Sequence, residues 1–380
     1  MKRTYAIVGA VAIVAVLIVA GLYAVMSAGS SKDGGDKDEQ GTITVTDMFG
    51  RSVEVPKNVK TVVTAGTSAL RFVSYLNGSA RVIGVEDFEK NTSAAAVGGR
   101  TYSIAHPEYA SLPSVGPQFG GDAELMARLN PEVIIYSPKT QQGSDCDALQ
   151  KNLGIPVVGL ITSVDLTTNI NKFYAQLDLV GEVLGTQPRA TELKEYVDSV
   201  IGDLKSRVAS ISEADRPTVY VGGLSYGSNH GLDWTTTNYV PFVYLNATNI
   251  ITTSLLSTGT GQINVEEIWA KNPDYVFVDL AGLSLAKQQY AQYKTSLDEI
   301  NAFKDGHVYG VLQTNWYASN WDTVLASCYF VGKVLYPDQF ADVNIGEKAN
   351  EIYTEMLGSA IYDQVVQNTG GTFGPISLAS

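Results

Sequence analysis

One pentapeptide in this sequence has the spacing of a catalytic nucleophile. Residues 223–227 read Gly-Leu-Ser-Tyr-Gly, follow the apolar run 218–221, and precede Asp279 and His307 in the order found in some hydrolases. Such a serine needs a helix directly after it, but the residues after Ser225 include two Asn, a Gly and a Pro, which favour a loop. No Gly-rich oxyanion loop precedes it. Surface hydrolysis by Ser225 is therefore kept only as an alternative of another class.

A pair of acidic residues lies in a phrase that the chain contains twice, at 122–136 and at 264–278. Each copy begins with Asp or Asn, a good N-cap, and places Glu124 or Glu266 in the first turn of a predicted helix. A carboxylate there interacts with the positive end of the helix dipole and stabilises the helix by about 0.3–1 kcal/mol. Helix stabilisation alone is therefore a sufficient explanation for both residues. Their matching positions also predict a symmetric pair of negative charges, one in each half of the molecule.

Histidines are too few for a bare metal ion to be held by the protein. The chain has three, at positions 106, 230 and 307, with no pair at metal-ligand spacing. We therefore expect no directly bound metal and no cofactor. A metal already wrapped in a chelator would need few protein ligands, and one Tyr or His could still serve as an axial haem ligand. No Gly-x-Gly-x-x-Gly opens a helix, so a dinucleotide site is not predicted.

The elements that must position these residues form two similar halves. Residues 42–56 alternate apolar and polar around a Phe-Gly turn and predict a β-hairpin. Strand and helix patterns then alternate up to about residue 161 and again after Pro217. This alternation predicts an α/β fold of two lobes, each with a helix-covered, mainly parallel sheet.

Between the halves the periodicity is helical only. Apolar residues recur at intervals of three and four from Ile170 to Leu184, Gly185 ends this helix, and Pro188 suits the first turn of a second one. The second helix, from about residue 188 to 210, would be roughly 35 Å long. The expected layout is a first lobe at 42–186, one long inter-lobe helix at 187–212, and a second lobe with terminal helices at 213–380.

The N-terminus predicts export. Lys2 and Arg3 precede an uncharged apolar run from Tyr5 to Met26, which as a helix spans roughly 33 Å, enough to cross a bilayer with the positive residues inside. We expect a signal peptide or, preferably, an uncleaved anchor at 1–26 and a flexible polar tether at 27–41. The folded part would then lie at the extracellular face of the cell membrane.

Charge and cysteine content narrow the partners. The formal net charge of −13 and the absence of basic clusters argue against nucleic acid. The two cysteines, Cys146 and Cys328, are expected in different lobes, so we do not expect a disulfide.

These features together resemble the ABC-importer substrate-binding proteins that capture iron–siderophores, cobalamin and haem. The resemblance covers nearly all of the chain from about Thr42 and is carried by DMFGRSVEVPKNVKTVV, RVIGVED, the two copies of the phrase, LGIPVV, the long helix and FKDGHVYGV. In that class a Glu at this place in each lobe pairs with arginines of the two permease subunits. The resemblance thus implies that Glu124 and Glu266 dock on a permease, with Glu267 able to share the second position.

The resemblance also implies a ligand cleft between the lobes, ringed by loops at strand ends. Little hinge motion is expected because a long helix bridges the lobes. Loop residues able to stack on, or hydrogen-bond to, a large complex follow several predicted strands; ordinary packing is the alternative for each. The candidates are Tyr102, Gln118 and Phe119 in the first lobe and Tyr226, His230, Trp234, Trp316, Tyr317 and Trp321 in the second. The expected function is capture, by a monomer, of a chelated metal for an ABC permease. An iron(III)–siderophore complex is the first expectation, with cobalamin or haem as alternatives.

Overall fold

The structure is a computed structural model that describes residues 41–162 and 164–379. The anchor expected at 1–26 and all but the last residue of the expected tether lie outside this part of the chain. Within it, no helix combines the length and the apolar character needed to cross a membrane.

The first lobe contains a four-stranded parallel sheet in the order β4-β3-β5-β6. All residues of β3 and β5 are buried, as expected for parallel strands covered by helices on both faces. The N-terminal hairpin of β1 and β2 is antiparallel, as the alternating sequence predicts. The strands are β1 (Thr42–Thr46), β2 (Ser52–Pro56), β3 (Val62–Gly66), β4 (Val82–Gly84), β5 (Val133–Ser137) and β6 (Val157–Gly159), and the helices are α2 (Ala69–Tyr75), α3 (Ala94–Val97), α4 (Thr101–Ala105), α5 (Ala123–Leu129) and α6 (Gly143–Leu153).

The second lobe contains a five-stranded sheet in the order β13-β12-β11-β7-β9. Its strands are parallel except β13, which pairs antiparallel with β12 at the edge. A separate two-stranded pair, β8 with β10, lies in the same lobe. The strands are β7 (Thr218–Gly222), β8 (Trp234–Thr236), β9 (Thr248–Asn249), β10 (Thr260–Gln262), β11 (Tyr275–Asp279), β12 (Val308–Val311) and β13 (Gly374–Pro375), and the helices among them are α9 (Val240–Tyr244), α10 (Glu266–Lys271), α11 (Leu283–Leu297) and α12 (Asn301–Lys304).

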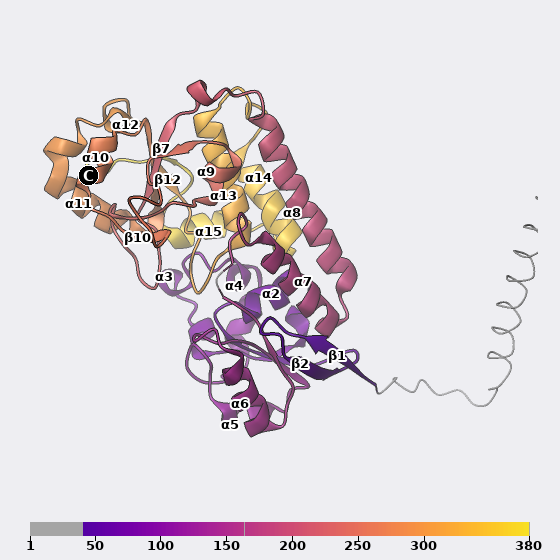
Figure 1. The fold of residues 1–380 in the computed structure, drawn as a ribbon. Helices are drawn as coiled ribbons and strands as arrows, with labels where there is room; N and C mark the ends of the chain where they lie inside the picture. The colour runs from indigo at the N-terminus through magenta and orange to yellow at the C-terminus, as the bar shows by residue number, and fades with distance from the viewer. Residues whose placement is uncertain (1–40, 163, 380) are drawn as a thin grey trace, which may run out of the picture. The chain divides into compact units, whose positions relative to one another are not determined.

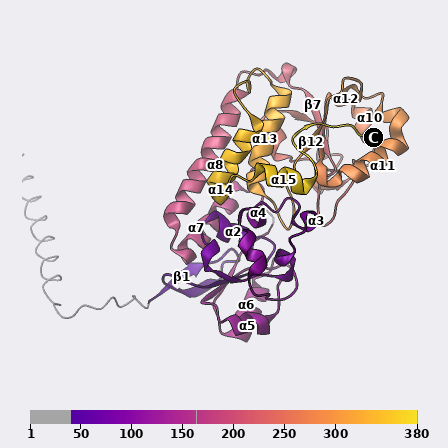
Figure 2. The same ribbon diagram turned by 180° about the vertical axis from the view of Figure 1, so that it is seen from behind.

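Two consecutive helices connect the lobes, and α8 is the long one that the sequence predicts. Helix α7 (Ile170–Leu184) ends at Gly185 in the left-handed conformation, and α8 (Gln187–Arg207) carries Pro188 in its first turn. Its 21 residues span about 32 Å. Three helices follow the last long strand: α13 (Trp321–Leu335), α14 (Ile345–Leu357) and α15 (Tyr362–Thr369). Figures 1 and 2 show α8 running beside α13 and α14.

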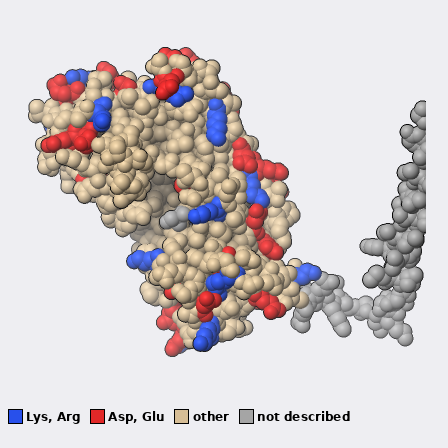
Figure 3. Space-filling model, viewed as in Figure 1, with Lys and Arg blue, Asp and Glu red and all other residues tan. Residues whose placement is uncertain are grey.

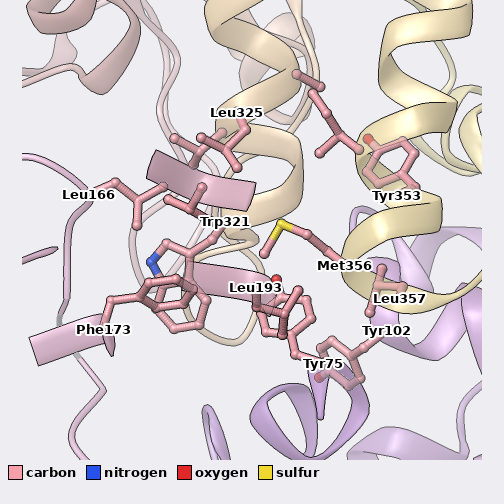
Figure 4. Close-up of a cluster of buried hydrophobic side chains, with 14 of the residues drawn as sticks. Tyr75, Tyr102, Leu166, Phe173, Leu193, Trp321, Leu325, Tyr353, Met356 and Leu357 are labelled. Atoms are coloured by element: carbon pink, nitrogen blue, oxygen red, sulfur yellow. The ribbon is translucent and has the colours of Figure 1, made fainter. Parts of the chain in front are cut away.

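A continuous hydrophobic core joins the two lobes. Trp321 at the start of α13 is 1% exposed, and its ring lies 5.0 Å from that of Phe72 in α2 and 4.9 Å from that of Phe173 in α7. Figure 4 shows Tyr75 of the first lobe in the same cluster as Met356 of α14. The lobes are therefore held together by side-chain packing as well as by the connecting helices.

The duplicated phrase folds the same way twice, as a short helix followed by a central strand. Its Asn residues, Asn130 and Asn272, end α5 and α10 in the left-handed conformation, with φ of 47° and 46°, and each is followed by Pro. Asn tolerates this conformation better than most residues, and Pro cannot continue the helix. The Asn-Pro pair thus ends the helix in each copy.

The acidic residue that ends each copy fastens the neighbouring strand. Glu132 accepts hydrogen bonds from the backbone N–H groups of Lys60 and Thr61, just before β3. Asp274 accepts from the backbone N–H of Thr218 at 2.9 Å and from its hydroxyl at 2.6 Å, at the start of β7. The same contact therefore recurs in both lobes, so the duplicated sequence corresponds to a duplicated structural unit.

Candidate ligand-binding cleft

A cavity of about 1000 Å³ opens between the loops of the two lobes, and Figure 3 shows the surface hollowed there. Its walls come from residues that follow parallel strands: Thr67 after β3, Lys139 after β5 and Thr162 after β6 in the first lobe, and the segments 224–229 after β7 and 314–319 after β12 in the second. Ligands of open α/β sheets bind outside the carboxyl ends of the strands. The topology of both sheets therefore aims the same kind of loop into one cavity.

The lining is mostly aromatic, hydroxyl and amide in character. Aromatic side chains stand on both walls, Phe88 and Phe119 on one and Tyr226, Trp316 and Tyr317 on the other. Tyr226 is 57% exposed, so its ring is free to contact a ligand. Such rings suit a large ligand with flat or apolar faces, and interspersed polar groups fix its orientation.

Tyr317 crosses from the second lobe to the first. Its hydroxyl donates to Glu86 Oε2 at 2.5 Å and accepts from the backbone N–H of Phe119 at 2.8 Å. Glu86 also accepts from the N–H groups of Gly66 and Gly120, and its burial raises the pKa of its carboxyl against these bonds. The hydroxyl of Tyr317 is thus fully used, and the ring is what this residue offers to a ligand.

A buried arginine holds the loop that carries Tyr317. Arg71 of α2 donates to the carbonyl oxygens of Trp316 at 3.1 Å and Tyr317 at 3.2 Å, and to Asn320 Oδ1 at 2.9 Å. The indole N–H of Trp316 donates to the carbonyl of Ala96 at 2.9 Å. The aromatic wall contributed by the second lobe is therefore fixed by donors and acceptors of the first.

Six of the nine residues predicted to contact ligand line the cavity. Trp321 is the least accessible of them, because it is core-packed and its N–H donates to the carbonyl of Val164 at 3.2 Å. The six are Gln118, Phe119, Tyr226, Trp316, Tyr317 and Trp321.

The other three, Tyr102, His230 and Trp234, lie outside the cavity lining. Tyr102 is 1% exposed and donates its hydroxyl to Glu89 at 2.8 Å. His230 stacks on Trp234 with ring centroids 3.9 Å apart, and its Nε2 lies 3.0 Å from the carbonyl oxygen of Tyr226. The first therefore belongs to the core, and the other two support the loop that presents Tyr226.

Two charged residues that are not among the predicted ligand contacts, Lys139 and Asp165, also line the cavity. Lys139 places Nζ 4.5 Å from the ring centroid of Phe119. Asp165 accepts from the backbone N–H of Thr167 at 2.7 Å and that of Thr168 at 2.8 Å. Burial would raise the pKa of Asp165, but the hydrogen bonds outweigh it and lower the pKa to about 2. The run Asp-Leu-Thr-Thr-Asn before α7 could have indicated this turn, because Asp bonds readily to backbone N–H groups just after it.

The geometry of a serine hydrolase is absent around Ser225. Its Oγ donates to Asn229 at 3.3 Å and accepts from Gln313 at 3.1 Å, and the next helix begins only at Val240. Ser225 follows the carboxyl end of β7, whereas His307 precedes the amino end of β12. Because these strands run parallel, the two residues lie at opposite ends of the strands. The Gly-x-Ser-x-Gly match is a loop of the cleft wall.

Metal-binding clusters are also absent from the part of the chain that the structure describes, where no group of three or more His, Cys, Asp and Glu could hold an ion. Cys146 of α6 and Cys328 of α13 are both buried free thiols, and burial raises the pKa of Cys146 to about 12.

The two predicted docking residues are solvent-exposed. The side chain of Glu124 is 87% exposed, with Arg128 Nη2 3.9 Å away, and Glu266 is exposed as well. Asp122 caps α5 as predicted, since its Oδ1 accepts from the N–H of Leu125 at 3.0 Å. In the second copy Asn264 Oδ1 accepts from the N–H of Glu266 at 3.0 Å, a turn that leads into α10.

The chain is similar to known proteins over most of its length. The model of the family described as periplasmic binding protein matches residues 74–312. The uncharacterized ABC transporter substrate-binding lipoprotein YvrC of Bacillus subtilis is 22% identical over 333 residues, which cover 84% of this chain and 96% of that protein. The molybdate-binding protein MolA of Haemophilus influenzae is 21% identical over 338 residues, 81% of this chain and 89% of that protein.

Solved structures show the same fold. A periplasmic solute binding protein from Veillonella parvula superposes with a TM-score of 0.65 at 19% identity, covering 87% of this chain and 97% of that one. The petrobactin-binding protein YclQ of Bacillus subtilis superposes with a TM-score of 0.57 at 18% identity, covering 78% of this chain and 99% of that one.

Proposed function

This chain belongs to the periplasmic binding protein family, and from that premise we propose that it captures a chelated metal of the iron(III)–siderophore type and delivers it to an ABC permease. Its family and relatives are solute-binding transport proteins, not enzymes. Catalysis by Ser225 is accordingly not proposed.

The observation that carries the proposal is the aromatic, inter-lobe cavity of about 1000 Å³. A molybdate-sized oxyanion would leave most of this volume unfilled. A bare metal ion would lack ligands, because the described residues contain no suitable cluster of His, Cys, Asp and Glu. A chelator supplies its own metal ligands and presents a broad organic surface, for which aromatic rings with a few amide and hydroxyl groups are suited.

Titration of the purified full chain tests the ligand class. Ferric siderophores, cobalamin, haemin and molybdate would each be added while the fluorescence of the chain's tryptophans is followed. We expect saturable quenching by at least one ferric siderophore. Saturation by molybdate alone would overturn the proposal, and saturation by cobalamin or haemin alone would replace iron–siderophore with that ligand.

Delivery is proposed to use Glu124 and Glu266, one exposed carboxylate at the same place in each lobe. Carboxylates that meet arginines of a partner add both attraction and register. The double variant Glu124→Ala/Glu266→Ala should abolish ligand uptake by cells while leaving ligand affinity within about twofold, since neither residue lines the cavity.

The matched control is Glu347→Ala, which removes another exposed Glu from the first turn of a helix, α14. Each of the three substitutions should cost about 0.3–1 kcal/mol of stability through the helix dipole. Uptake that survives the double variant, or falls equally in Glu347→Ala, would show that these carboxylates only stabilise their helices.

A further inference from the structure

The cavity lining contains few charges for its size. Among the residues that line it, Lys139 and Asp165 alone are ionisable at neutral pH. Both carboxylate oxygens of Asp165 are occupied, because Oδ1 accepts from the N–H groups of Thr167 and Thr168, and Oδ2 accepts from the Thr168 hydroxyl at 2.8 Å and from Asn169 Nδ2 at 3.1 Å. Both oxygens of this carboxylate therefore accept hydrogen bonds from the turn that follows Asp165, which leaves little acceptor capacity for a cationic ligand.

Of the charged lining residues in the described part of the chain, Lys139 remains available to a ligand. It is exposed, and its Nζ lies over the ring of Phe119 rather than beside a carboxylate; the ion pairs found in the described part of the chain do not include it. A cation over an aromatic face keeps its charge and stays partly hydrated. It can meet one negative group of a ligand.

The arginines nearest to the wall do not add to this charge. Arg71 spends both terminal nitrogens on Trp316, Tyr317 and Asn320, behind the aromatic loop. Arg100 is fully buried and paired with Glu89 at 2.6 Å. Among the described residues, Lys139 is therefore the cation that a ligand in the cavity can meet.

Neutral polar groups remain for the rest of the ligand surface. The side-chain amides of Gln118 and Asn315 line the cavity, and no hydrogen bond to another described residue engages either of them. They can donate to carbonyl or hydroxamate oxygens on the outside of a chelate. A polyanionic chelate would instead give up the hydration of charges that find no partner here, which disfavours its binding.

Among the residues that the structure describes, the lining thus offers one available cation and several neutral polar groups. From this we infer that the bound chelate carries either no net charge or one negative charge, and that Lys139 pairs with that negative charge. The inference rests on the proposed function, because it concerns the same cleft and the same class of ligand. It divides siderophore complexes by charge: a ferric tris-hydroxamate is neutral, and a ferric tris-catecholate carries three negative charges.

The test compares these two probes on the full chain by fluorescence titration at low and moderate salt. We expect the neutral complex to bind at least about tenfold more tightly than the trianionic one, a difference of about 1.4 kcal/mol. A third probe, a ferric tris-hydroxamate that bears one free carboxylate, carries a single negative charge. Lys139→Ala should weaken its binding by about threefold or more and should leave that of the neutral complex within about twofold.

Lys151→Ala is the control, since it removes an exposed lysine from α6, outside the lining. It should change the affinity for none of the probes. Equal or tighter binding of the trianion, or equal effects of the two lysine variants, would overturn the charge inference and leave the proposed function standing. Failure of all ferric complexes to bind would overturn the proposed function itself.

Discussion

Asp279 ends β11 directly beneath two loops that line the cleft, and its carboxyl is buried. Its Oδ1 accepts from the backbone N–H of Ala281 at 3.0 Å. Burial raises the pKa of Asp279 to about 7, against the lowering effect of the backbone N–H groups of Ala281, Ser225 and Thr314. Ser225 and Thr314 belong to the cavity lining. The carboxyl of Asp279, with its raised pKa, therefore lies next to the backbone of the cleft wall.

The Asp279→Asn variant tests this raised pKa. An unfolded Asp loses its proton near pH 4, so between about pH 4 and 7 the folded chain holds a proton that the unfolded chain has released. Stability therefore falls as pH rises through this window, and the loss is complete above about pH 7. Asn cannot ionise, so the variant should gain up to about 4 kcal/mol relative to the parent between pH 4 and pH 8, by urea denaturation.

Exposed Asp305→Asn, in the loop before β12, is the control and should show no such trend. A stability difference between parent and Asp279→Asn that stays constant from pH 4 to 8 would mean that Asp279 is ionised in the folded state throughout.

At the scale of single residues the sequence identifies loop aromatics but not the direction in which they project. Trp316 and Tyr317 follow a predicted strand and do line the cavity, yet Trp234 follows one too and lies behind Tyr226. Tyr102 is buried where its hydroxyl donates to Glu89, and Glu89 pairs with Arg100, an arrangement between neighbouring segments that no helix or strand periodicity contains. Lys139 is missed for the converse reason, since a lysine in a loop ordinarily indicates only solvent.

Among the elements, the two short helices of the duplicated phrase end by the same device. Asn130→Ala and Asn272→Ala should each lower the free energy of unfolding by about 1 kcal/mol. Alanine is strained at positive φ, because it has a Cβ atom but lacks the local hydrogen bonding of Asn. Gly at 130 should restore stability fully. Gly at 272 should restore it only in part, because Asn272 Oδ1 also accepts from the N–H of Asn301 at 2.8 Å. Urea unfolding of the four variants measures this, and equal losses with Ala and Gly at 130 would exclude the backbone explanation.

Element boundaries follow the sequence closely wherever a residue fixes the backbone. Gly185 and Pro188 place the junction of α7 and α8 within a residue or two of expectation. The pair of β8 and β10 is not predicted, since strands of three residues are too short for a period of two to appear. The edge strand β13 is missed for the same reason.

For the whole molecule, the long helix between the lobes predicts little hinge motion. The structure adds the hydrogen bonds of Arg71 to the second lobe and those of Asp322 in α13, which accepts from the hydroxyls of Tyr75 at 2.8 Å and Thr101 at 2.9 Å. These contacts are buried between the lobes, where unpaired polar groups are costly. Restricted motion of the lobes stays a prediction, now with named contacts behind it.

Arg71→Met tests this interface. It should lower stability by about 3–5 kcal/mol, because it leaves two carbonyl oxygens and Asn320 without their donor. Amide hydrogen exchange in residues 314–320 should become faster, while exchange in β11 changes only with the global stability. Tyr317→Phe, which keeps the ring and removes only the hydroxyl, should have the smaller effect. Unchanged exchange at 314–320 in Arg71→Met would show that the loop is held without the arginine.

The C-terminal helices give the order of synthesis a consequence for folding. Met356 and Leu357 of α14 lie in the cluster that contains Tyr75, and Asp322 of α13 binds the same tyrosine. The first lobe is synthesised first, but α13 and α14, which follow much later in the chain, complete its packing around Tyr75. A nascent chain therefore cannot complete that lobe before these two helices have been synthesised, and the two lobes must mature together.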